Sequence, residues 1–113
     1  MATIKSYTDL EQSQKLVEIL PHESADMYYH NRVDIPDNFP LPIEWKRGLP
    51  LLSQEIPCWS LAALLEILPS STLDSSNDHY YRLRCMERFT EWYDNALDAC
   101  VEMIIKLHEQ KIL

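Results

Sequence analysis

Residues 95–113 read NALDACVEMIIKLHEQKIL and carry the clearest helical pattern in the chain. Asn95 is a favourable N-cap residue, and Asp98 falls in the first turn, where a carboxylate interacts with the positive end of the helix dipole. Apolar residues recur at helical spacing and form one core-facing stripe: Ala96, Cys100, Met103, Ile104 and Leu107. The pattern predicts a helix at about 95–110, with no catalytic signature on it.

A second helix is predicted within residues 56–69, which read IPCWSLAALLEILP. Pro57 is compatible with a helix start and Pro69 with a helix stop, so the predicted bounds are about 58–68. Leucines follow the i, i+3, i+4, i+7 spacing of a buried stripe: Leu61, Leu64, Leu65 and Leu68. We therefore expect substitution of Leu64 or Leu65 to be strongly destabilising.

A third helix is predicted at about 9–20. Thr8 and Glu11 have the spacing of a capping box, in which the hydroxyl and the carboxylate bond each other's backbone N–H groups. Pro21 ends this helix, because the residue before a proline avoids the α conformation.

Residues 80–94 are compatible with two different structures. Tyr81, Leu83 and Cys85 alternate with arginines, which is the period of a half-buried strand. The apolar residues of this region also follow helical spacing, so the alternative is a mostly α protein with one long C-terminal helix at 80–111. No Asn-Gly or Asp-Gly marks a tight turn, but the tyrosine- and tryptophan-rich composition favours two strands.

The remaining segments are less regular. One or two short strands are predicted within 27–45, where Met27-Tyr28-Tyr29 could instead form a helical turn, and residues 70–78 are predicted to be a polar loop. The fold class that follows is α+β. Three helices pack on one small antiparallel sheet, formed by residues 80–94 and the short strands from 27–45, within one globular domain, residues 1–113.

Composition excludes several classes of function. The net charge of −8 repels phosphate backbones and disfavours nucleic-acid binding, and the single glycine cannot build a phosphate-binding loop. No apolar run approaches the length of a membrane span. Three cysteines make no disulfide framework, so we expect a cytoplasmic protein without a cofactor.

No catalytic or metal-binding residues are predicted. Cys58 stands where a helix could begin, and Asp74, Asp78 and His79 share the polar loop, so a pocket near Cys58 and residues 74–79 is the alternative for a small enzyme or ligand-binding domain. The arginines 82, 84 and 88 form the one basic cluster. Because interfaces favour arginine and tryptophan, the predicted interaction face consists of Arg82, Arg84, Arg88 and Trp92.

Three segments carry a resemblance to a family. They are Ala25-Asp-Met-Tyr28, residues 56–69 and residues 92–108. They resemble a family of short, acidic, uncharacterised proteins from gut bacteria and their mobile elements, and this resemblance implies no activity, ligand or catalytic residue. The leading hypothesis is a non-enzymatic interaction module that binds a protein partner or itself. A third hypothesis is an acidic mimic of nucleic acid.

Overall fold

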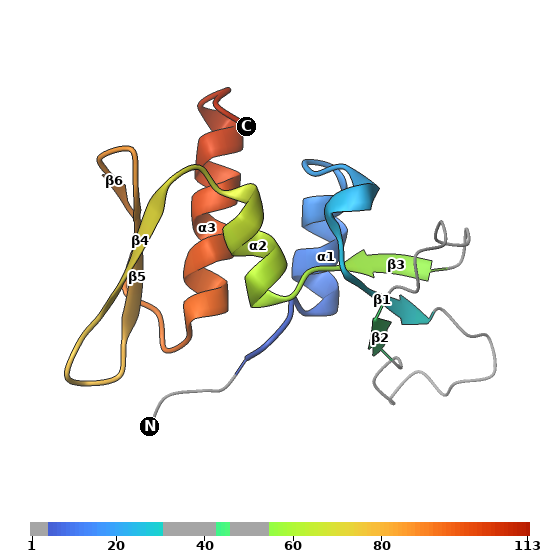
Figure 1. Ribbon diagram of the computed structural model, residues 1–113, viewed down its shortest axis with the longest axis horizontal. Helices are drawn as coiled ribbons and strands as arrows, with labels where there is room; N and C mark the ends of the chain where they lie inside the picture. Colours follow the sequence, from blue (N-terminus) through green and yellow to red (C-terminus); the bar gives the residue numbers. More distant parts are fainter. Residues whose placement is uncertain (1–4, 31–42, 46–54) are drawn as a thin grey trace.

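The structure, a computed structural model, describes residues 5–30, 43–45 and 55–113. Its architecture is α+β, as predicted (Figure 1). The elements in chain order are α1 (Leu10–Val17), the short 3-10 helix η1 (His22–Ser24), β1 (Met27–His30), β2 (Ile43–Trp45), β3 (Glu55–Cys58), α2 (Leu61–Ile67), β4 (Ser71–Ser75), β5 (Tyr81–Cys85), β6 (Arg88–Phe89) and α3 (Ala96–Glu109).

The strands form two antiparallel sheets, ordered β2-β1-β3 and β4-β5-β6, at opposite ends of the molecule (Figure 1). The strands from 27–45 therefore do not join those of 80–94 in one sheet, as was predicted. The alternative of one long C-terminal helix is wrong, because β5 and β6 occupy its first part. The prediction of a polar loop at 70–78 is also wrong, since Ser71–Ser75 pairs along its whole length with β5. β4 can be polar because it is an edge strand and one of its faces is in solvent.

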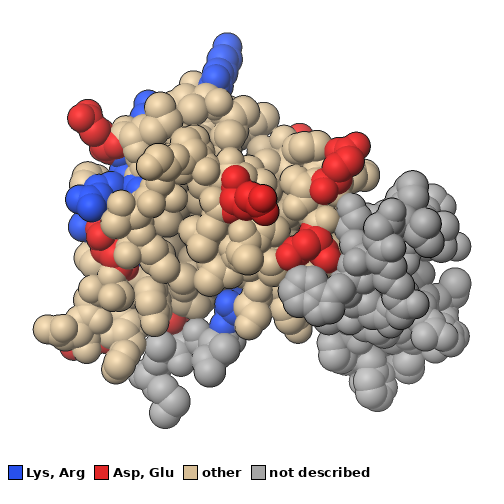
Figure 2. Space-filling model, in the orientation of Figure 1, with Lys and Arg blue, Asp and Glu red and all other residues tan. Residues whose placement is uncertain are grey.

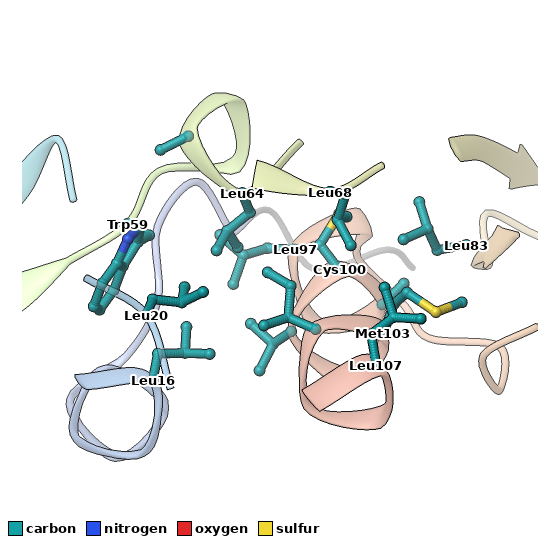
Figure 3. Packing of buried hydrophobic residues seen from close by; sticks show 14 of the residues in the cluster. Leu16, Leu20, Trp59, Leu64, Leu68, Leu83, Leu97, Cys100, Met103 and Leu107 are labelled. Carbon is teal, nitrogen blue, oxygen red and sulfur yellow. The ribbon is translucent and has the colours of Figure 1, made fainter. Parts of the chain in front are cut away.

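Helix α3 lies between the β4-β5-β6 sheet and the other two helices (Figure 1). Asn95 caps it, because its side chain accepts a hydrogen bond from the backbone N–H of Asp98 at 2.8 Å. Packing on two sides explains why its apolar surface is wider than one stripe. The buried residues of α3 are Leu97, Ala99, Cys100, Val101, Met103, Ile104 and Leu107 (Figure 3).

Helix α1 begins one residue later than the predicted capping box requires. Asp9 is the N-cap, and it exchanges capping-box hydrogen bonds with Gln12, at 2.8 and 3.1 Å. Thr8 is instead fully buried, and its hydroxyl accepts a hydrogen bond from the Trp59 backbone N–H at 3.1 Å. The predicted Thr8–Glu11 box is therefore wrong, because tertiary contacts use the threonine.

Helix α2 begins three residues later than predicted. Pro57 and Cys58 belong to β3, which pairs with β1, and Ser60 is the N-cap. Leu64 is fully buried against α3, but Leu65 is 37% exposed, so its prediction as a core residue is wrong. The two leucines are neighbours about 100° apart around a helix, and only one of them faces α3.

A two-residue turn joins β5 to β6. Cys85 and Arg88 are directly paired, and Met86 and Glu87 between them have φ angles of 51° and 64°. This left-handed conformation costs a residue with a Cβ about 1–2 kcal/mol. The turn is of the kind that Asn-Gly usually forms, and the absence of that signal made the hairpin hard to predict.

The double variant Met86→Asn/Glu87→Gly is expected to be more stable than the wild type by about 0.5–1 kcal/mol, because both new residues tolerate positive φ. Urea unfolding followed by circular dichroism measures the change. Glu87→Ala keeps the Cβ and is the control, for which no gain is expected. A double variant no more stable than this control would contradict the assigned turn.

Candidate functional site

The outer face of the β4-β5-β6 sheet, the side away from α3, gathers large aromatic and basic side chains. Leu83 and Cys85 are buried on the α3 side, so Arg82 and Arg84 lie on the outer side. Phe89 joins them because it is paired with Arg84. Figure 2 shows basic side chains over the end of the molecule that this sheet forms. We name the group Tyr80, Arg82, Arg84, Phe89 and Trp92 the aromatic–arginine face.

Arg82 organises this face. Its guanidinium carbon lies 4.6 Å from the centre of the Phe89 ring and 4.7 Å from that of the Trp92 ring. Its Nη2 donates to Asp74 of β4 at 3.2 Å, and this ion pair anchors the guanidinium to the neighbouring strand. Cation–π contacts with two rings hold both aromatic side chains in place. Arg82 is thus a positioning residue more than a free charge.

Trp92 lies on this face because the chain after β6 continues to pair with β5. Tyr81 and Tyr93 exchange backbone hydrogen bonds of 2.6 and 2.8 Å. Beside Trp92 is an open hollow of about 330 Å3, lined also by Ser76, Asp78 and Tyr80. The exposed fractions are 45% for Phe89, 44% for Trp92 and 48% for Tyr80. Such rings present much apolar surface to a partner.

The structure separates one predicted residue from the other three. Arg88 is paired with Cys85 and therefore lies on the α3 side of the sheet. Its guanidinium donates to the Gln110 side chain beyond α3 and to the Met86 carbonyl. Arg84 lies on the outer face, exposed, and has no ion pair with any residue in the described ranges. Arg88 therefore does not lie on the same side of the sheet as Arg82 and Arg84.

Sequence reasoning missed Phe89, Tyr80 and Asp74 as members or supports of this face. The alternation that selects Arg82 and Arg84 extends back to Tyr80, so that residue could have been found. Phe89 could be assigned to a side only after the turn at residues 86–87 was located.

Cys58 and the segment 74–79 do not lie together. Cys58 ends β3, and residues 74–79 close the β4–β5 hairpin at the other end of the molecule (Figure 1). Asp74 itself is on β4 and bonded to Arg82. Within the described residues, Cys58 and residues 74–79 do not line one pocket, as the alternative hypothesis of a ligand-binding domain or enzyme required. Cys58 is also not at a helix N-terminus, because α2 begins at Leu61.

Cys58 is fully buried, and burial raises the pKa of its thiol, although hydrogen bonds from Thr8, Ser13 and Tyr29 act in the opposite direction. Iodoacetamide should label it slowly from pH 5 to 9, and label it quickly only in denaturant, because the thiolate is the reactive form. The other two cysteines are buried as well and serve as internal references. Mass spectrometry of labelled peptides measures each rate, and fast labelling of Cys58 alone in the folded protein at pH 6 would contradict this prediction.

An open groove of about 300 Å3 lies between α1 and α3. Although burial alone would raise the pKa of Asp98 in this groove, hydrogen bonds from Lys5, Asn95 and Gln12 keep it below its usual range. Glu102 accepts from the Glu91 backbone N–H at 3.0 Å. Asp98 and Glu102 are thus engaged within the chain, and the charged residues Glu11 and Lys15 of α1 also line the groove.

In the part of the chain that the structure describes, no three His, Cys, Asp or Glu side chains are grouped as a metal site requires. None of the described helices is long and apolar enough to cross a membrane.

The acidic side chains of the face in Figure 2 are separated from one another by other residues. Comparison with protein-family models, curated proteins and solved structures finds no match to this chain.

Proposed function

We propose that this protein is a non-enzymatic protein–protein interaction module, and that the aromatic–arginine face is its binding surface. The observation that carries the proposal is the position of Arg82 between two rings that remain almost half exposed. Tryptophan, tyrosine and arginine are the residues that contribute most binding energy at interfaces. A cytoplasmic location, as three unpaired cysteines suggest, belongs to the same proposal.

The construction of the face supports binding in a second way. The Phe89 and Trp92 rings are held by Arg82, so these two side chains have little conformational entropy left to lose on binding. Arg84 supplies a positive charge with no ion-pair partner in the described part of the chain. The partner surface that complements this face is apolar with an acidic rim, and electrostatic complementarity would set its orientation.

The test is affinity purification from the native host with tagged wild-type protein and the variants Trp92→Ala and Phe89→Ala. A protein retained by the wild type should be depleted by about 30-fold or more in the Trp92→Ala sample, as expected for loss of a residue at the centre of an interface. Leu65→Ala is the matched control, because Leu65 is a similarly exposed apolar residue on α2. Partners that remain equally abundant with all three variants would contradict the proposal.

A further inference from the structure

Strand β4 forms one edge of its sheet, since β5 is its sole partner within the described residues. Its sequence, Ser-Thr-Leu-Asp-Ser, contains neither lysine nor proline, the residues with which proteins usually protect an edge from pairing with another chain. Leu73 at its centre is 38% exposed. The edge is therefore open to a further strand.

The hydrogen bonds of β5 establish which backbone groups of β4 point outward. Leu83 donates to the Thr90 hydroxyl at 2.9 Å and accepts from the Thr90 N–H at 3.0 Å, so both its backbone groups point away from β4. Its directly paired residue is Leu73. In an antiparallel ladder the paired residues either exchange both bonds or neither, so the N–H and C=O of Leu73 point outward.

The same alternation of hydrogen-bonded and non-hydrogen-bonded pairs determines where the backbone groups point at both ends of β4. Tyr81 directs its backbone bonds to Tyr93, and Tyr81 is the paired residue of Ser75. Backbone groups therefore point outward at Ser71, Leu73 and Ser75, whereas Thr72 and Asp74 face β5. This is a symmetric set around Leu73.

We propose that β4 pairs with β4 of a second copy of this chain, antiparallel, with Leu73 on the two-fold axis. This register places each outward-pointing residue opposite another one, Leu73 against Leu73 and Ser71 against Ser75 of the second copy. Each such pair exchanges two hydrogen bonds. The two exposed Leu73 side chains then lie beside each other on the α3 side of the joined sheet.

The charges of the strand fit the same register. Asp74 comes opposite Thr72 of the second copy and not opposite its own symmetry mate, so no like charges face each other across the pair. Asp74 is also paired with Arg82 in its own chain. A second copy is thus a complement to this edge both in hydrogen bonding and in charge. The contact is small, and with two chains of net charge −8 it forms a weak dimer that salt strengthens.

Two substitutions of opposite charge at Thr72 test the pairing. Within one chain Thr72 is exposed and paired with Arg84, so the carboxylate of Thr72→Asp has a favourable neighbour and the monomer stays folded. In the dimer this carboxylate faces Asp74 of the second copy, and the two-fold symmetry creates two such like-charge pairs. We expect the dimer Kd to rise about tenfold for Thr72→Asp. It should fall several-fold for Thr72→Lys because this lysine, unlike an edge lysine with no carboxylate opposite it, faces Asp74 of the second copy.

Sedimentation equilibrium on the full chain, from about 5 to about 500 µM at about 0.3 M salt, measures the three constants. Urea unfolding at the lowest concentration checks that each monomer is folded, and slower amide exchange of Leu73 at high concentration locates the contact. A wild type that is monomeric throughout, or Kd values that do not move in opposite directions, would overturn the proposal. Trp92→Ala should dimerise as the wild type does, so failure of this proposal and failure of the proposed function are distinguishable.

Discussion

Leu64→Ala is expected to lower the free energy of unfolding by about 2–5 kcal/mol, a large share of the ~5–15 kcal/mol typical of a domain. Leu64 has no exposed surface and packs in the cluster that joins α2 to α3 (Figure 3). Truncation of the Leu64 side chain removes apolar surface from the core and leaves a cavity between α2 and α3 that the packed helices cannot easily fill. Urea unfolding measures the loss.

Leu65→Ala is the matched control for this substitution. It removes the same atoms from the same helix, but from a partly exposed position, and should cost less than about 1 kcal/mol. Equal losses for the two variants would mean that α2 does not face α3 through Leu64.

Thr8→Val is expected to lower the free energy of unfolding by about 1–3 kcal/mol, although the two side chains have nearly the same shape. The Thr8 hydroxyl accepts from the Trp59 backbone N–H and lies 2.8 Å from the Ser13 hydroxyl, with all of these groups buried. A methyl group in its place leaves the N–H without an acceptor, and an unsatisfied buried donor carries its full desolvation cost. Thermal and urea unfolding measure the effect.

Thr72→Val is the control for this substitution. Thr72 is exposed, so replacing its hydroxyl leaves no buried hydrogen-bonding group without a partner. Its effect should stay within about 0.5 kcal/mol. If Thr8→Val were equally mild, the hydroxyl would not be the acceptor that ties the start of α1 to the end of β3.

Local signals predict α3 well, because several of them agree. The Asn95 cap, the acidic first turn and the apolar spacing all point to the same bounds, and the helix begins and ends within a residue of them. Helix α2 is less predictable, since Pro57 suits a helix start but pairs with Tyr28 of β1, a residue distant in the chain. Such long-range pairing leaves no local trace in the sequence.

In the candidate site, too, local patterns predict some positions, whereas others depend on pairing between segments. The period of two correctly places Arg82 and Arg84 on one face, because that is a property of a single strand. Arg88 and Phe89 follow the turn, and their faces depend on its length and position. Met86 and Glu87 give no hint of a tight turn, so the side on which each residue lies became known only from the pairing of Cys85 with Arg88.

The central position of α3 has a consequence for protein synthesis. Leu16 and Leu20 near the start of the chain are buried in the same cluster as Leu107, close to its end. During synthesis Leu16 and Leu20 are therefore made well before Leu107, with which they share this cluster. The hairpins and α3 itself are contiguous in sequence, with short loops that close at low entropic cost. Only the contacts of α1 with the main cluster wait for α3, because α1 also packs on β3 beside a separate small cluster of Met27, Tyr29 and Cys58.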